Sequence, residues 1–198
     1  MTTLTVITGP MFSGKSDELL RRIKNAVLAG LKVKAFQPAA DNRQSGIATQ
    51  RWDEKNEEFV PAEIFPATKV NSPGDIYEVL ASDMPDVIVF DEAQFFPGWI
   101  FEVVQNLLFG CMKKFKVLPQ EVLVAGLDMW ADGTPAGEMP NLLAMCNNPV
   151  KITGICQLCS LPKKPSVMTY KKHVGAGQVE IGNKPYKTVC RDCWRRPK

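Results

Sequence analysis

Residues 9–16, with the sequence Gly-Pro-Met-Phe-Ser-Gly-Lys-Ser, place the strongest constraint on how this chain can fold. They match the phosphate-binding pattern G-x-x-x-x-G-K-[ST] at every fixed position. The glycines let the backbone curl so that successive N–H groups face a phosphate, Lys15 adds a positive charge, and the Ser16 hydroxyl can bind Mg²⁺. We therefore predict a phosphate-binding loop. Its residues are Gly9, Pro10, Met11, Phe12, Ser13, Gly14, Lys15 and Ser16.

The segments on either side of this loop support the same interpretation. Residues 4–7 form a short run rich in β-branched side chains, as expected of a strand. After the loop, apolar residues recur at the spacing of one helical face. They are Leu19, Leu20, Ile23, Val27 and Leu28. A phosphate held between such a strand and helix lies at the positive end of the helix dipole. The alternative, a chance glycine-rich turn, would not explain why a strand and a helix flank the motif.

Two carboxylates follow an apolar run in residues 86–92, Asp-Val-Ile-Val-Phe-Asp-Glu. This pattern is typical of a buried parallel strand, which would deliver Asp91 and Glu92 to the carboxyl edge of the sheet. Asp91 would hold Mg²⁺ through water. Glu92 could polarise water in a hydrolase or accept the proton of a substrate hydroxyl in a kinase. The structural alternative is an acidic helix N-cap after a core strand.

Four cysteines near the other end of the chain form two C-x-x-C pairs, Cys156 with Cys159 and Cys190 with Cys193. Four thiolates suit a tetrahedral Zn²⁺ ion. Because the protein would supply all four ligands, no coordination position stays open, and we predict structural rather than catalytic zinc. Paired disulfides and an iron–sulfur cluster are the alternatives.

The remaining sulfur and imidazole side chains carry little metal signal. Cys111 and Cys146 each stand alone in an apolar helical stretch, like ordinary buried thiols, and His173 is better explained as a solvated loop residue than as a ligand. The chain shows no signal peptide, so a reducing cytoplasm is the expected location.

Length and composition set matching limits. A chain of 198 residues, of which 45% are hydrophobic, can bury one good core and a small appendage. It has no apolar run long enough to span a membrane. The formal net charge of +3 is too small to indicate a nucleic-acid partner. We therefore expect neither a membrane nor a nucleic acid as partner, and the local basic charge suits solubility or the attraction of phosphorylated small molecules.

Strand and helix patterns alternate along the chain, which predicts an α/β fold with a parallel sheet. The expected strands lie near 3–8, 32–37, 86–91 and 121–127, and the expected helices near 15–29, 73–82, 97–115 and 139–147. Residues 38–71 are polar with scattered prolines and are predicted to form loops and a short ribbon. From residue 149 the composition changes to short segments and cysteine pairs, so we divide the chain into domains 1–148 and 149–198.

Three motifs in order resemble the type II thymidine kinases: residues 9–16, Asp-Glu-Ala-Gln-Phe-Phe at 91–96, and Val-Cys-Arg-Asp-Cys-Trp at 189–194. The likeness covers nearly the whole chain and extends to residues 38–43, 126–128 and 179–182. It implies a RecA-like P-loop domain with a zinc-bearing lasso domain. It also implies ATP-dependent transfer of the γ-phosphoryl group to the 5′-hydroxyl of a deoxynucleoside, in pyrimidine deoxynucleoside salvage, by a homotetramer.

The resemblance also assigns roles to residues. Asp91 and Ser16 would place Mg²⁺ beside ATP, Glu92 would be the general base, and Arg43 matches a family arginine near the phosphates. Arg51 is a weaker candidate, because the motif around it is poorly kept. Further residues match positions that line the family's nucleoside pocket. They are Met11, Phe95, Leu127, Thr169, Val179, Ile181, Gly182 and Tyr186.

Residues 129–136 depart from the family pattern. Many members carry a Phe at the positions of Ala131 and Ala136, and Trp130 is a large ring not expected at its place. Either Trp130 fills the space, or the pocket is widened for a bulkier pyrimidine such as a 5-substituted deoxyuridine. The expected substrate is thymidine, with another deoxyuridine as the alternative.

Two other classes of function compete with a nucleoside kinase. A zinc-ribbon ATPase acting on nucleic acid would need a basic face rich in aromatic residues, which the sequence does not display. A catalytically idle nucleotide-binding scaffold is disfavoured because Lys15, Ser16, Asp91 and Glu92 are all present.

Overall fold

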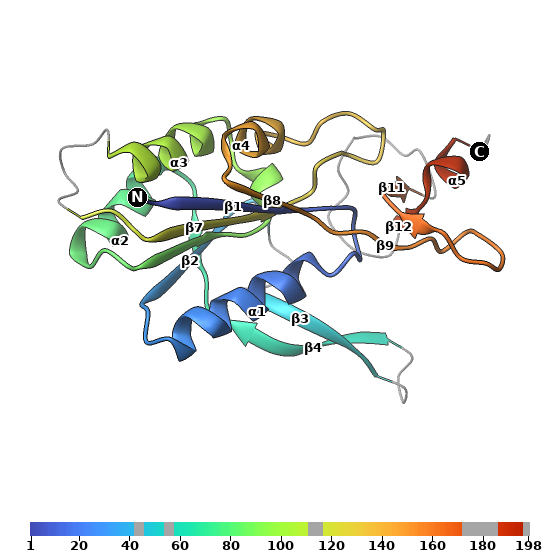
Figure 1. The fold of residues 1–198 in the computed structure, drawn as a ribbon, viewed down its shortest axis with the longest axis horizontal. Helices are drawn as coiled ribbons and strands as arrows, with labels where there is room; N and C mark the ends of the chain where they lie inside the picture. The colour runs from blue at the N-terminus through green and yellow to red at the C-terminus, as the bar shows by residue number, and fades with distance from the viewer. Residues whose placement is uncertain (42–45, 54–57, 111–116, 172–185, 196–198) are drawn as a thin grey trace.

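A parallel sheet of six strands organises the molecule (Figure 1). The structure is a computed structural model that describes residues 1–41, 46–53, 58–110, 117–171 and 186–195. The strand order is β5-β2-β6-β7-β1-β8, and every neighbouring pair is parallel. The strands are β1 (Thr3–Thr8), β2 (Val33–Pro38), β5 (Thr68–Val70), β6 (Val87–Phe90), β7 (Glu121–Gly126) and β8 (Asn148–Lys151).

The central strands are apolar because both faces of the sheet are covered. All four residues of β6 are buried, as are the last five residues of β1 and of β7. Strands buried on both faces read as continuous hydrophobic runs, which is the pattern of β6 and of residues 122–125 in β7, whereas β1 includes the buried Thr5 and Thr8. The predicted α/β fold with a parallel sheet is confirmed.

Three helices cover one face of the sheet (Figure 1). They are α2 (Pro73–Ser82), α3 (Trp99–Phe109) and α4 (Met139–Met145). The core beneath them contains Phe36 and Phe90, whose stacked rings lie 5.6 Å apart between centroids. The predicted helix 97–115 is too long, since α3 ends where Gly110 adopts a left-handed backbone (φ 65°) and donates its N–H to Asn106. Residues 111–116 lie outside the described part.

The opposite face carries α1 (Lys15–Leu28) and the hairpin of β3 (Ile47–Asp53) and β4 (Glu58–Phe65) (Figure 1). Leu19, Leu20 and Ile23 pack into this second core as predicted. The prediction is wrong for the other two residues of the helical face, because Val27 and Leu28 are exposed. The chain turns at Gly30 to enter β2, so the last turn of α1 is left uncovered by the sheet.

Residues 38–71 contain more structure than predicted. The hairpin is longer than a short ribbon, and β5 joins the edge of the central sheet by pairing with β2. Ile47 anchors the hairpin, since its side chain is fully buried in the core under α1. A strand of three residues is too short for its apolar period to register in the sequence.

The C-terminal part forms small antiparallel pairs at the carboxyl end of the central strands (Figure 1). Strand β8 belongs to the central sheet and extends from 148 to 151, past the start of the predicted second domain. Beyond it, β9 pairs with β10 and β11 with β12. The elements are β9 (Gly154–Ile155), β10 (Pro165–Ser166), β11 (Met168–Lys171), β12 (Tyr186–Val189) and α5 (Arg191–Trp194). Among the described residues we find no helix with the length and apolar character needed to cross a lipid bilayer.

Candidate active site and metal centre

The predicted phosphate loop joins β1 to α1 in a backbone shape that depends on its two glycines. Gly9 has φ 151° and Gly14, which directly precedes the helix, has φ 89°. A side chain at Gly9 would collide with the carbonyl oxygen of Ile152. The loop leads directly into the N-terminus of α1, where the helix dipole favours an anion.

The loop also carries polar side chains that could bind a phosphate. The Lys15 ammonium donates a 2.8 Å hydrogen bond to the carbonyl of Pro10 within the loop. The Ser13 hydroxyl is buried and has no hydrogen-bond partner among the described residues. Phe12 holds a left-handed backbone (φ 60°), which costs energy for a residue with a side chain. A buried donor without a partner and a strained loop suit a site that a phosphate completes.

Asp91 lies at the carboxyl end of β6, buried, with one carboxylate oxygen accepting a 3.0 Å hydrogen bond from the Gln37 amide. The same amide of Gln37 is also bonded to both backbone groups of Gly46, at the start of the hairpin. One strand, β7, separates β6 from the strand that enters the loop, so the two strands are about 9.5 Å apart. The arrangement places a buried carboxylate across from the phosphate loop.

Glu92 follows in an unusual backbone conformation, with φ 52° and ψ 43°. It precedes the short 3₁₀ helix η1 (Ala93–Phe95), yet its side chain makes no capping hydrogen bond. Its carboxylate instead accepts a 2.6 Å bond from the side-chain amide of Gln94. The alternative of a helix N-cap therefore does not describe this carboxylate, whose observed partner is a neighbouring amide.

A hydrogen bond joins two of the predicted nucleoside-pocket residues, and another joins a third to Gln94. The backbone N–H of Met11 donates to the Thr169 hydroxyl at 3.1 Å, which ties the phosphate loop to β11. The backbone N–H of Leu127 donates to the side chain of Gln94 at 2.9 Å. Thr169 and Leu127 are buried, and Tyr186 is half-buried at the start of β12.

Some predicted site residues cannot be placed. Arg43, Val179, Ile181 and Gly182 lie outside the described residues. Arg51 lies on β3, of which only the backbone is described at that position.

The segment 129–136 forms a tight loop with Trp130 on one side. The Trp130 ring lies against Phe95, with centroids 5.7 Å apart and planes tilted by 44°. Ala136 is fully buried, and the carbonyl of Ala131 accepts a 3.0 Å bond from the indole N–H of Trp194. The larger ring thus packs beside a predicted pocket residue.

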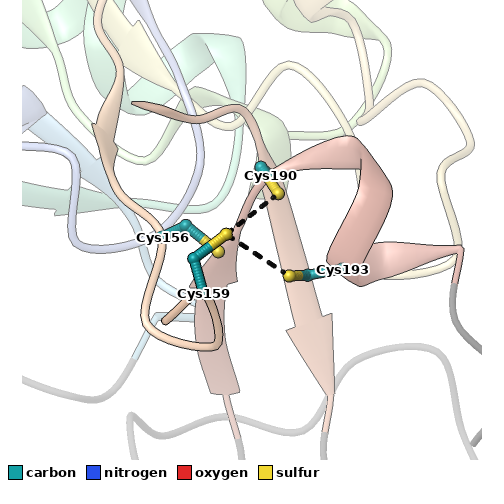
Figure 2. Close-up of side chains that lie close together, drawn as sticks. All are labelled: Cys156, Cys159, Cys190 and Cys193. Atoms are coloured by element: carbon teal, nitrogen blue, oxygen red, sulfur yellow. Dashed lines mark hydrogen bonds between the residues drawn. The ribbon is translucent and has the colours of Figure 1, made fainter. Parts of the chain in front are cut away.

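The four paired cysteines come together in one cluster, drawn in Figure 2. Their sulfur atoms all lie within 4.8 Å of one another, and Cys159 Sγ is 3.7 Å from Cys190 and 3.6 Å from Cys193. A tetrahedron of thiolates with zinc–sulfur bonds of about 2.3 Å has edges of about 3.8 Å. The cluster fits structural zinc, and the sulfurs are too far apart for disulfides.

The surroundings of the cluster favour a thiolate at one position. Burial opposes ionisation of Cys156, but hydrogen bonds from the backbone of Cys190, Leu158 and Cys159 lower its pKa to about 6. Outside the cluster, Cys146 is only half-buried at the end of α4, and desolvation raises its pKa. Cys111 and His173 lie outside the described residues.

Four side chains that organise this region were not among the predicted site residues: Gln37, Gln94, Lys151 and Trp194. Lys151, on β8, forms a 2.7 Å ion pair with the buried carboxylate of Asp128 just after β7. Gln94 stands inside the motif 91–96, and an amide side chain so close to two acids was the signal that could have identified it. The others depend on contacts between segments far apart in the sequence.

Known proteins similar to this chain agree on one family. The sequence model of the family described as "Thymidine kinase" matches residues 2–194. The thymidine kinase of Mycoplasma genitalium is 33% identical over 187 residues, which are 94% of this chain and 80% of the relative. The thymidine kinase of Porphyromonas gingivalis is 32% identical over 195 residues, which are 98% of this chain and 85% of the relative. The similarity extends well beyond the phosphate loop.

Proposed function

The chain belongs to the thymidine kinase family and is a kinase, and we propose that it transfers the γ-phosphoryl group of ATP to the 5′-hydroxyl of thymidine, giving dTMP. The observation that carries the proposal is the arrangement at the carboxyl edge of one sheet. A phosphate loop, a buried acid on a strand two positions away and a second acid beside it converge there. Nucleoside phosphorylation uses these three parts.

The phosphate loop binds the nucleotide. Its N–H groups and the Lys15 ammonium hold the phosphates, and the unpartnered Ser13 hydroxyl can add one more donor. Ser16 and Asp91 are the residues that would hold Mg²⁺, which neutralises charge on the phosphates when bound. Arg43, which lies outside the described residues, belongs to the same group by resemblance.

Glu92 accepts the proton of the 5′-hydroxyl as that oxygen forms its bond to the γ-phosphorus and ADP leaves. The phosphoryl transition state is loose, so the protein contributes mostly positioning and charge neutralisation. A general base adds about 10²- to 10⁴-fold in rate, provided that its carboxylate faces the hydroxyl.

The nucleoside base binds between the phosphate loop and the C-terminal segments. The described residues that we assign to this pocket are Met11, Phe95, Leu127, Thr169 and Tyr186, with Val179, Ile181 and Gly182 outside the described part. The contact of Trp130 with Phe95 supports a pocket that is closed rather than widened. A substrate with a methyl group at position 5 is therefore favoured over one with a bulky substituent.

Zinc, held by the four cysteine thiolates, fastens α5 to the turn after β9. The spacing of the sulfurs supports this assignment. The division into domains 1–148 and 149–198, a homotetrameric assembly and a cytoplasmic location complete the proposal and rest on composition and family resemblance.

A phosphorylation assay tests the function. The protein is incubated with ATP and Mg²⁺ and with thymidine, deoxyuridine, deoxycytidine or 5-substituted deoxyuridines, and the nucleoside monophosphates are quantified. Thymidine is expected to give the highest kcat/KM. A higher value for a bulky 5-substituted deoxyuridine would support the alternative substrate, and ATP hydrolysis that is stimulated by nucleic acid, without nucleoside phosphorylation, would overturn the proposal.

A further inference from the structure

We propose that Gln94 is a positioning residue that aims the Glu92 carboxylate at the acceptor hydroxyl and ties it to the segment that binds the nucleoside. The inference rests on the proposed role of Glu92 as general base. It concerns a residue that does not itself touch the reacting atoms. Four observations on the amide, its surroundings and the Glu92 backbone support it.

The first observation is that both ends of the Gln94 amide are used. Its NH₂ group donates to the Glu92 carboxylate at 2.6 Å, and its oxygen accepts the backbone N–H of Leu127 at 2.9 Å. Its orientation follows from its partners, since a rotated amide would turn its oxygen toward a carboxylate and its NH₂ group toward an N–H donor. The side chain therefore has one satisfactory arrangement.

The second observation is burial. Gln94 is 3% exposed, although a glutamine is seldom buried this deeply. A buried amide that lost either partner would leave an unsatisfied polar group. The donor end of the hydrogen bond to Glu92 is therefore buried, and the bond restrains the carboxylate more firmly than a contact between two exposed side chains would.

The third observation is that two glycines leave room for this residue. A Cβ atom on Gly126 would lie 2.7 Å from the Gln94 side-chain oxygen, and one on Gly137 would lie 2.6 Å from the Gln94 carbonyl oxygen. These glycines come from the end of β7 and from the loop before α4. Segments distant in sequence are thus shaped around both the side chain and the backbone of Gln94.

The fourth observation is the Glu92 backbone itself. Its left-handed conformation is strained for a residue with a Cβ atom, and such conformations persist where the surroundings hold them. The turn is held on the main chain by the N–H of Phe95, which donates to the Glu92 carbonyl at 3.0 Å. Gln94 holds the side chain, so backbone and carboxylate are both fixed.

The bond to Leu127 connects this arrangement to the substrate. Leu127 follows β7 and is one of the residues assigned to the nucleoside pocket. The Gln94 amide is therefore hydrogen-bonded both to the proposed general base, Glu92, and to a residue of the pocket wall, Leu127. It fixes the position of the Glu92 carboxylate relative to that wall. Misplacement of a catalytic group by about 1 Å can cost on the order of 10²-fold in rate. Loss of Gln94 should lower kcat and leave ATP binding intact.

Two variants test the hydrogen bonds that Gln94 forms with Glu92 and Leu127. Gln94→Glu keeps an oxygen that can accept the Leu127 N–H but places a second carboxylate against Glu92. Gln94→Met keeps the length of the side chain and removes both hydrogen bonds. For both variants we expect kcat for thymidine to fall by about 10- to 100-fold, with KM for ATP within about twofold of the wild type. Unchanged kcat in either folded variant would overturn the inference.

The chain offers a matched control at Gln120. Its amide donates to the Asp86 carboxylate at 3.1 Å, on the exposed amino edge of the sheet. Gln120→Glu makes the same chemical change beside a carboxylate, far from the proposed site. We expect its kcat to equal that of the wild type. A loss of kcat as large as that of Gln94→Glu would show that an added negative charge lowers kcat wherever it is placed, and this result would overturn the inference.

A double-mutant cycle distinguishes positioning from general stabilisation. If Gln94 acts through Glu92, adding Gln94→Met to Glu92→Gln should lower kcat by no more than about twofold further, because the base is already absent. If the kcat loss of the double variant equals the product of the two single losses, Gln94 acts independently of Glu92, and the inference is overturned. Thermal unfolding midpoints of all variants show whether each is folded.

The same measurements separate this inference from the function on which it rests. If the wild type does not phosphorylate thymidine, the proposed function fails. If Glu92→Gln retains near-normal turnover, Glu92 is not the base, and the inference fails with that assignment. If Glu92→Gln is impaired and the losses multiply, the proposed function stands and only the role of Gln94 is overturned.

Discussion

Truncation of Trp194 is expected to loosen the loop 129–136 and weaken nucleoside binding. Trp194 stands on α5 directly after Cys193, one of the four clustered cysteines. Its indole N–H donates to the Ala131 carbonyl at 3.0 Å, and a Cβ on Gly133 would lie 2.9 Å from its ring. The ring therefore connects the cysteine cluster directly to the loop that carries Trp130.

The size of the effect follows from these two contacts. Trp194→Phe keeps an aromatic ring and loses the hydrogen bond, which is worth about 1 kcal/mol. Trp194→Ala also loses ring packing. Truncating a fully buried Trp costs about 3 to 5 kcal/mol, so a half-buried ring accounts for about 2 kcal/mol. The total of about 3 kcal/mol corresponds to about 10²-fold in local opening, against about fivefold for the Phe variant.

Amide hydrogen exchange measures this opening directly. The N–H groups of Trp130, Gly133 and Ala136 are all hydrogen-bonded within the loop and report on it. They should exchange about fivefold faster in Trp194→Phe and about 10²-fold faster in Trp194→Ala, while amides of α2 stay unchanged. KM for thymidine should rise more than KM for ATP.

Two results would refute this reasoning. Loop amides that exchange at the wild-type rate in Trp194→Ala would mean that the indole does not hold the loop. Exchange accelerated equally in α2 would mean that the substitution lowers the stability of the whole protein. The Phe variant is the internal control, because it must fall between the wild type and the Ala variant.

Three further variants test the proposed site. Glu92→Gln keeps shape but cannot accept a proton, so kcat should fall by about 10²-fold or more with ATP affinity little changed, and near-normal turnover would contradict the assignment. Cys190→Ser should release zinc, which contributes on the order of 10 kcal/mol to folding such modules, and should make residues from about 150 onward sensitive to protease; full zinc content measured by atomic absorption would contradict this. Trp130→Ala should raise KM for thymidine sharply, and an unchanged KM would show that other residues close the pocket.

The parts of the site predicted from sequence are those in which a local pattern dictates the chemistry. The phosphate loop uses glycine at two positions where φ is positive, Gly9 at 151° and Gly14 at 89°. The end of the apolar run at Phe90 marks where the chain leaves the sheet, so Asp91 necessarily lies at its carboxyl edge. The cysteine pairs likewise carry their own spacing. Each of these signals lies within a few adjacent residues.

The parts that were missed depend on contacts between distant segments. Gln94 is hydrogen-bonded to Leu127, and Trp194 to Ala131. These partners are too far apart in the sequence for the spacing of apolar residues to indicate the contact. The exposed end of α1 is a similar case, because apolar spacing predicts a face but not how far the covering layer extends. Strand β5 is stabilised by its neighbour β2 rather than by its own three residues.

The contacts around residue 149 join the two segments that the composition separates. Strand β8 pairs with β1, and the Ile152 N–H then donates to the Thr8 carbonyl at 2.7 Å, at the entrance to the phosphate loop. A Cβ on Gly154 would lie 3.3 Å from the carbonyl of Phe12, so the chain leading to the cysteines packs directly against that loop. The Thr169 hydroxyl adds a hydrogen bond to the same loop from β11. Because the C-terminal segment supplies part of the loop's support, we expect loss of order around the four cysteines to disturb the phosphate loop as well.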